Sequence, residues 1–177
     1  MNTAPTINVD ALRGGMKPGL SPVVGASFAE AASVCLGERG HASGCTLVVD
    51  GAVSATIGLA FTAAGDDAHR SWNDGPVATE HGAYGLAILL VNHFEGYTVV
   101  ERSRKGTGFD FWLGRDEVAL FQNKARLEVS GIREGNESTI AARVKEKCGQ
   151  LQPEFKNFPA FVAVVEYSRP LARLVKP

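Results

Sequence analysis

The sequence has little cysteine, little net charge and no long apolar run, and each absence excludes a class of protein. Cys35, Cys45 and Cys148 are an odd number without metal-ligand spacing, which argues against a disulfide scaffold and structural zinc and favours reduced thiols. Basic residues number 18 and acidic residues 19, unlike an autonomous nucleic-acid-binding protein. Without a membrane span or a signal-like N-terminus, we expect a cytoplasmic protein with no membrane partner.

Familiar catalytic signatures are also missing. There is no GxxxxGK[ST] phosphate loop, because the segment Lys105 to Gly108 lacks the spacing and lies between expected strands. No GxSxG nucleophile elbow occurs, and no local motif supports a cysteine–histidine nucleophile. The length of 177 residues fits a single domain.

The N-terminal part of the chain predicts an extension to a core. Glycine and proline recur through residues 1–25 without a periodic apolar pattern, which predicts a loosely ordered arm. Residues 26–76 predict a helix and a β-hairpin, since Ser27 opens a capping-box pattern and Asp50-Gly51 suits a tight turn. The polar stretch after the hairpin is expected to be a mobile connection.

Residues 77–177 predict a core with the order helix, three strands, helix and strand. Apolar residues at helical spacing predict a buried first helix that ends at Gly96. A crossover helix at 137–150 leads to a continuous apolar strand, which predicts parallel pairing. The expected strands are 98–100, 109–113, 125–132 and 161–165. The sequence therefore predicts an α/β fold with a mixed sheet.

Two acidic residues stand out in this core. Asp110 and Glu128 are flanked by apolar residues in strands that should be at least half buried, where a carboxylate is costly unless compensated. Antiparallel pairing of the two strands sets Asp110 beside Glu128. Glu80 lies at the N-terminal end of the inward face of the first core helix. A divalent cation or a hydrogen-bond network would compensate these charges.

The arrangement resembles the restriction-endonuclease-like superfamily, the PD-(D/E)XK nucleases. The residues that carry the resemblance are Glu80 on the first helix, Asp110 after a glycine-rich turn, and Glu128-Val129-Ser130 on the third strand. The resemblance implies that Asp110 and Glu128 are ligands of Mg²⁺ or Mn²⁺, that the Val129 carbonyl adds an oxygen, and that Glu80 supports the metal. It also implies that Glu80, Asp110, Glu128 and Ser130 hold the catalytic positions.

The resemblance covers about residues 77–168 and implies an α-β-β-β-α-β core with a mixed central sheet. The N-terminal helix and hairpin would be an addition to that core. The implied function is metal-dependent hydrolysis of DNA phosphodiester bonds, in which the metal neutralises phosphate charge and lowers the pKa of a bound water.

Ser130 stands where this family has a lysine, and serine supplies no positive charge. Loss of such a transition-state contact typically costs ~10²–10³ in rate. Three explanations are open: the cation has moved to Lys124, Arg126, Arg104 or Lys105, the metal alone supports slow cleavage, or activity is lost. The candidate phosphate contacts are Arg102, Arg104, Lys105 and Lys124.

Each site residue also has an ordinary structural explanation. Asp110 can cap the glycine-rich turn, and Glu80 suits the positive end of a helix dipole. Glu128 can form an ion pair with Arg126, Lys124 or Arg143. The alternative function is therefore a catalytically silent nuclease-fold subunit of a larger nucleic-acid-processing or defence complex. The expected partners are DNA, another protein or a second copy of the chain.

Overall fold

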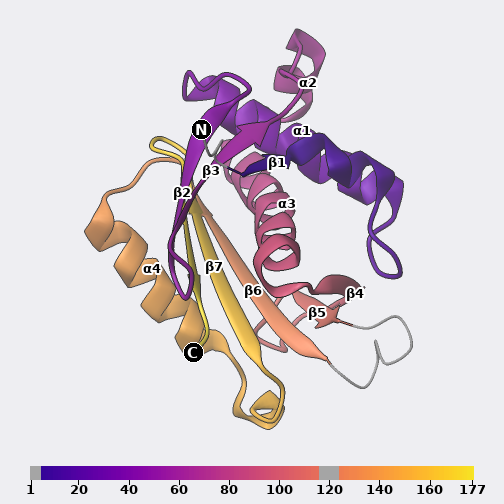
Figure 1. Cartoon of the computed structure of the whole chain (residues 1–177), viewed down its shortest axis with the longest axis vertical. Coiled ribbons are helices and arrows are strands. Elements are labelled where there is room, and N and C mark those ends of the chain that lie inside the picture. The colour runs from indigo at the N-terminus through magenta and orange to yellow at the C-terminus, as the bar shows by residue number, and fades with distance from the viewer. Residues whose placement is uncertain (1–4, 116–123) are drawn as a thin grey trace.

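In the computed structural model, which describes residues 5–115 and 124–177, eight strands form one mixed sheet (Figure 1). The strands are β1 (Thr6–Asn8), β2 (Cys45–Gly51), β3 (Ala55–Ala60), β4 (Thr98–Arg102), β5 (Phe111–Gly114), β6 (Ala125–Ile132), β7 (Ala160–Glu166) and β8 (Leu171–Val175). Their order across the sheet is β1-β3-β2-β8-β7-β6-β5-β4. The fold is therefore α/β, as predicted.

Helices cover both faces of this sheet. The helices are α1 (Pro22–Glu38), α2 (Asp66–Ser71), α3 (Gly75–Glu95) and α4 (Glu137–Gln150), with short 3₁₀ helices η1 (Val9–Gly14) and η2 (Pro153–Phe155). The larger core lies between the sheet and the α1 and α3 layer, and a smaller one lies beneath α4 on the other face (Figure 1). Among the described residues, no helix is both long and apolar enough to span a bilayer.

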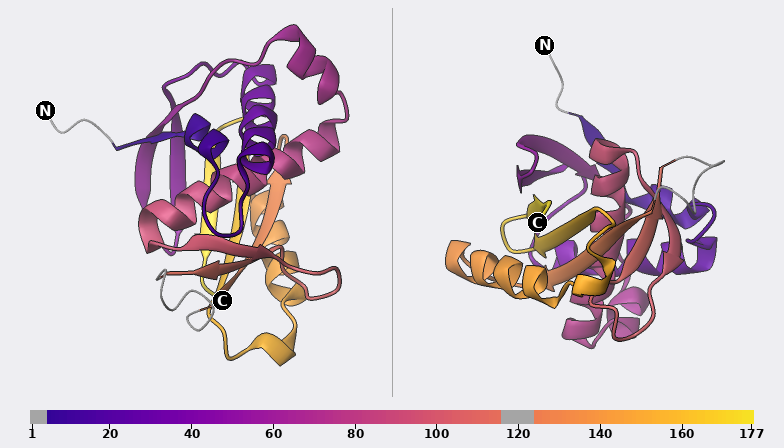
Figure 2. Two further views of the ribbon diagram at one scale, coloured as in Figure 1. Left: turned by 90° about the vertical axis from the view of Figure 1, so that its right-hand side faces the viewer. Right: turned by 90° about the horizontal axis from the view of Figure 1, so that it is seen from below.

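The predicted order of the core is confirmed. β4, β5 and β6 pair antiparallel, and α4 crosses over to β7, which pairs parallel with β6. α3 begins at Gly75 because the side chain of Asp74 accepts a hydrogen bond from the Val77 amide, and it ends at Gly96 in the left-handed conformation. Figure 2 shows β4 and β5 running across the direction of β6 and β7. The hairpin of β2 and β3 is also confirmed.

The predicted loosely ordered arm is wrong for the described residues 5–25. This segment forms β1, η1 and the start of α1, and Val9 and Leu12 are fully buried. α1 begins with Ser21 as its cap, earlier than the predicted start at Ser27. The connection after the hairpin is not a plain loop either, because it contains α2. Contacts with the rest of the molecule order these segments.

Two further differences concern strands. The predicted strand 109–113 starts too early, because β5 begins at Phe111. Asp110 therefore lies just before the strand and not within it. β8 was not predicted; it pairs antiparallel with β7 and parallel with β2, which joins the hairpin and the core in one sheet. The apolar strand β7 therefore lies inside the sheet between β6 and β8 rather than at an open edge.

Candidate functional site

The candidate site lies where β5 and β6 separate. The pairing of β5 with β6 starts at Phe111, the first residue of β5, which lies opposite Leu127. The amide of the preceding residue, Asp110, donates to the Leu127 carbonyl at 2.8 Å. Beyond this point the chain turns away at Gly108, whose φ is +78° and where an added Cβ would lie 1.9 Å from the Gln150 carbonyl oxygen. Beyond Leu127, the side of β6 that faces β5 therefore has no partner among the described strands, while the other side pairs with β7.

Asp110 supplies the missing partner. Its Oδ2 accepts a hydrogen bond of 2.8 Å from the amide of Val129. The alternative in which Asp110 caps backbone amides is thus correct in kind, but the amide belongs to β6 and not to the glycine-rich turn. The Asp110 carboxylate is therefore held beside the middle of β6, just before β5 begins.

Tyr84 of α3 connects Asp110 with Glu80. The Tyr84 hydroxyl is 3.1 Å from Asp110 Oδ1 and also contacts Glu80, one helical turn earlier. Arg102 of β4 donates to the same hydroxyl at 3.2 Å, and its guanidinium lies 4.7 Å from the centre of the Tyr84 ring. Glu80, Asp110 and Arg102 therefore meet around the hydroxyl of Tyr84.

Glu128 is buried in the middle of β6 and faces α4. Lys147 Nζ lies 2.7 Å from Glu128 Oε1 and also contacts Gln150 at 3.0 Å. Burial, together with the nearby charge of Asp110, raises the pKa of Glu128 to about 7, while Lys147 acts in the opposite direction. Asp110 and Glu128 thus form a carboxylate pair, in which the negative charge of Asp110 acts on Glu128.

The cation beside this pair comes from α4 and was missed. Lys147 and Arg143 are four residues apart on the helix, and Glu128 and Ser130 are two residues apart on the strand. These spacings match at about 6–7 Å. Arg143 Nη1 donates to Ser130 Oγ at 2.7 Å, and Lys147 contacts Glu128. Each cation of α4 therefore contacts one residue of β6: Arg143 contacts Ser130, and Lys147 contacts Glu128.

The cations that the sequence analysis proposed lie in different surroundings in the structure. Arg126 is buried and donates to the Phe158 carbonyl at 3.0 Å, so its guanidinium is bound elsewhere. The expected partners of Glu128 among Arg126, Lys124 and Arg143 are replaced by Lys147. Lys124 Nζ lies 5.2 Å from the centre of the Trp112 ring. Arg102, Arg104 and Lys105, in contrast, do lie beside the carboxylate pair.

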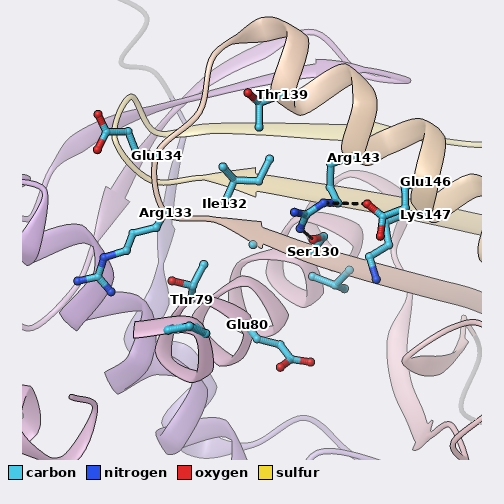
Figure 3. A pocket seen from close by; sticks show the side chains of 13 residues that line it. Thr79, Glu80, Ser130, Ile132, Arg133, Glu134, Thr139, Arg143, Glu146 and Lys147 are labelled. Carbon is cyan, nitrogen blue, oxygen red and sulfur yellow. Dashed lines mark hydrogen bonds and ion pairs between the residues drawn. The ribbon is translucent and has the colours of Figure 1, made fainter. Parts of the chain in front are cut away.

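Two hollows open around these residues. The first hollow, of about 330 Å³, is lined by Glu80, Tyr84, the carboxylate pair and the basic turn Arg102 to Lys105. The second hollow, of about 590 Å³, lies between the start of α3, β6 and α4 (Figure 3). Glu80 from α3 and Arg143 and Lys147 from α4 lie around it. Glu80 lines both hollows.

The donor set fits a hard divalent cation with few protein ligands. No cluster of three or more His, Cys, Asp or Glu side chains that could hold a metal occurs in the part of the chain that the structure describes. Mg²⁺ commonly binds through one or two carboxylates and keeps several waters. Asp110 and Glu128 match that requirement.

The fold and the site together define an α/β protein with a carboxylate pair and a lysine where β5 begins beside β6 of a mixed sheet. Comparisons with protein-family models, curated proteins and solved structures found no significant match. The functional inference therefore depends on the geometry of the site.

Proposed function

We propose that the chain is a metal-dependent nuclease of the restriction-endonuclease-like type that hydrolyses phosphodiester bonds in DNA. The observation that carries the proposal is the carboxylate pair of Asp110 and Glu128 with the Lys147 ammonium 2.7 Å from Glu128. The element order α3-β4-β5-β6-α4-β7 supports it, because this is the order that the resemblance implies.

Asp110, Glu128 and the Val129 carbonyl would hold Mg²⁺ or Mn²⁺, with Glu80 in support. The bound cation would neutralise charge on the phosphate and lower the pKa of a water ligand. The protein's own contribution is to aim the two carboxylates from neighbouring strands. The Val129 amide holds Asp110, and Lys147 holds Glu128.

Lys147 would supply the positive charge that Ser130 lacks. An ammonium held beside the carboxylate pair stabilises negative charge that develops on a phosphate in the transition state. This contact favours the explanation in which the cation has moved, although the source is α4 rather than the β6 and turn residues proposed from the sequence. Ser130 would keep a supporting role, because it binds the neighbouring Arg143.

The basic turn would bind phosphates on either side of the scissile bond. Arg102, Arg104 and Lys105 are exposed and line the first hollow. With 18 basic and 19 acidic residues in the chain, phosphate affinity must come from such a local cluster. Lys124 is proposed to extend this contact.

A cleavage assay with linear and plasmid DNA tests the proposal. We expect cleavage by the wild type with Mg²⁺ or Mn²⁺, loss of cleavage on adding a chelator, and loss in Asp110→Ala. Asp67→Ala is the matched control, because Asp67 is exposed on α2. Absence of metal-dependent cleavage by the wild type would overturn the enzymatic proposal.

Ser130 favours one alternative, a catalytically silent subunit of a nucleic-acid-processing or defence complex that binds DNA, a protein partner or a second copy. Mobility-shift measurements with the wild type would distinguish it. DNA binding without any cleavage supports the silent subunit, whereas cleavage excludes it.

A further inference from the structure

The Tyr84 hydroxyl is the point where three elements around the carboxylate pair meet. Tyr84 is 2% exposed and belongs to α3. Its hydroxyl contacts Glu80 of the same helix, lies 3.1 Å from Asp110 Oδ1 beside β5, and accepts a hydrogen bond of 3.2 Å from Arg102 of β4.

A phenol has one proton, so this hydroxyl cannot donate to both carboxylates at the same time. One carboxylate accepts the hydrogen bond from the phenol. An oxygen of the other carboxylate then lies against the phenol oxygen with no hydrogen between them, so two lone pairs face each other. That contact is repulsive unless positive charge lies nearby. Arg102 supplies that positive charge, because its Nη2 lies 3.2 Å from the Tyr84 hydroxyl.

The core fixes where this hydroxyl lies. The Tyr84 ring packs edge-on against Phe111 with 5.2 Å between ring centres, and Phe28 lies 5.6 Å away. The guanidinium of Arg102 covers the ring at 4.7 Å. A tyrosine packed in this way has little freedom to move its hydroxyl away from Asp110.

We propose that Tyr84 is a positioning residue for the cation site, which orients Asp110 and transmits the charge of Glu80 to it. The proposal rests on the proposed cation site at Asp110 and Glu128. The Val129 amide holds one Asp110 oxygen, and the Tyr84 hydroxyl, whose one proton serves either Asp110 or Glu80, lies 3.1 Å from the other oxygen. These two neighbours together set the plane of the carboxylate. Glu80 then acts on the cation through Tyr84 rather than as a direct ligand.

Binding of Mn²⁺ alone, followed by the electron paramagnetic resonance signal of free Mn²⁺, tests this role without DNA. We expect Tyr84→Phe to weaken Mn²⁺ binding about 10- to 100-fold. Tyr167→Phe is the matched control. Tyr167 is also fully buried, and its hydroxyl has no hydrogen-bond partner among the described residues, so its loss should leave Mn²⁺ affinity unchanged.

The outcomes separate the two proposals. A wild type that binds no Mn²⁺ removes the cation site and the role of Tyr84 with it. If the wild type binds Mn²⁺, Asp110→Ala abolishes binding and Tyr84→Phe binds like the wild type, only the role of Tyr84 is overturned. Thermal unfolding of each variant shows whether it is folded.

A double-mutant cycle tests the transmission of charge from Glu80. Glu80 is exposed, so Glu80→Gln leaves the packing intact. We expect Glu80→Gln to weaken Mn²⁺ binding about fivefold in the wild type and to have no further effect in the Tyr84→Phe background. Additive effects would show that Glu80 acts independently. If Tyr84→Phe does not fold, an unchanged affinity in Glu80→Gln alone still overturns the proposal.

Discussion

Two buried glutamates on the neighbouring parallel strands β6 and β7 have opposite surroundings. Glu166 is 0% exposed, and its Oε2 accepts from the Arg169 amide at 2.9 Å. Its Oε1 accepts from the amides of Gly135 and Ser168 at 3.3 and 2.8 Å and from the Ser168 hydroxyl. Glu128 is 4% exposed, and among the described residues one donor, Lys147, forms a hydrogen bond with it. The Asp110 carboxylate lies close by.

The difference teaches that the hydrogen-bond donors around each carboxylate, and not its burial, distinguish the two glutamates. Glu166 is surrounded by neutral backbone donors that satisfy its charge and close the turn between β7 and β8. Glu128 is buried beside a like charge, an arrangement that raises its pKa and costs stability. Such an arrangement is typical of catalytic and metal sites.

The largest effect is expected at Glu166. Glu166→Ala removes the acceptor of three backbone amides and a hydroxyl, each of which costs about 1–3 kcal/mol when left unpaired in the interior. We expect the free energy of unfolding to fall by about 3–5 kcal/mol, measured by urea denaturation. Glu128→Gln should change it by less than about 1 kcal/mol. A larger loss in Glu128→Gln than in Glu166→Ala would invert the comparison.

The next effect concerns catalysis by Lys147. Lys147→Met should lower the rate of DNA cleavage about 10²–10³-fold, equivalent to about 2.7–4 kcal/mol, because the ammonium beside Glu128 is lost. Lys145→Met is the matched control, since Lys145 is exposed on the same helix. Equal rates for the two variants would show that Lys147 only neutralises Glu128.

A cation bound at Glu128 should stabilise the folded protein, whereas Glu166 should bind no cation. At a Mn²⁺ concentration of about 100 times Kd, the free energy of unfolding of the wild type should rise by about 2.7 kcal/mol. Denaturation with and without Mn²⁺ measures this rise, which Glu128→Gln should abolish and Glu146→Gln, an exposed change on α4, should retain. Stabilisation that persists in Glu128→Gln would place the cation elsewhere.

The smallest effect is a rescue. Ser130→Lys in the Lys147→Met background returns a cation to β6, two residues after Glu128 and on the same face of the strand. We expect about a tenfold recovery of the cleavage rate, or about 1.4 kcal/mol. Ser138→Lys in the same background adds the charge at an exposed position of α4 and should restore nothing. Equal recovery in both variants would indicate a general charge effect.

The parts of the fold that the sequence predicted have strong local signals. The crossover helix over 137–150 and the strand over 125–132 match α4 and β6, because their apolar periods differ and turn residues bound them. The segment of residues 5–14 has no period that a pattern could reveal. Val9 and Leu12 are buried only because α1 and α3 pack against them.

The candidate site was predictable as far as the strands go. Asp110 and Glu128 lie together because Phe111, the residue after Asp110, pairs antiparallel with Leu127, the residue before Glu128. Lys147 was not among the predicted cations, since only the packing of α4 on β6 decides which side of the helix faces the strand. Tyr84 was not predicted as a site residue, although its spacing of four residues from Glu80 was a signal that its hydroxyl had a partner.

The parallel pairing of β2 with β8 has a consequence for synthesis on the ribosome. Val48 pairs with Leu171, so the hairpin of β2 and β3 is made long before its neighbour emerges. Until then one edge of β2 is unpaired, and such edges promote association between nascent chains. Completion of this sheet therefore requires β8, which is synthesised more than 100 residues after β2.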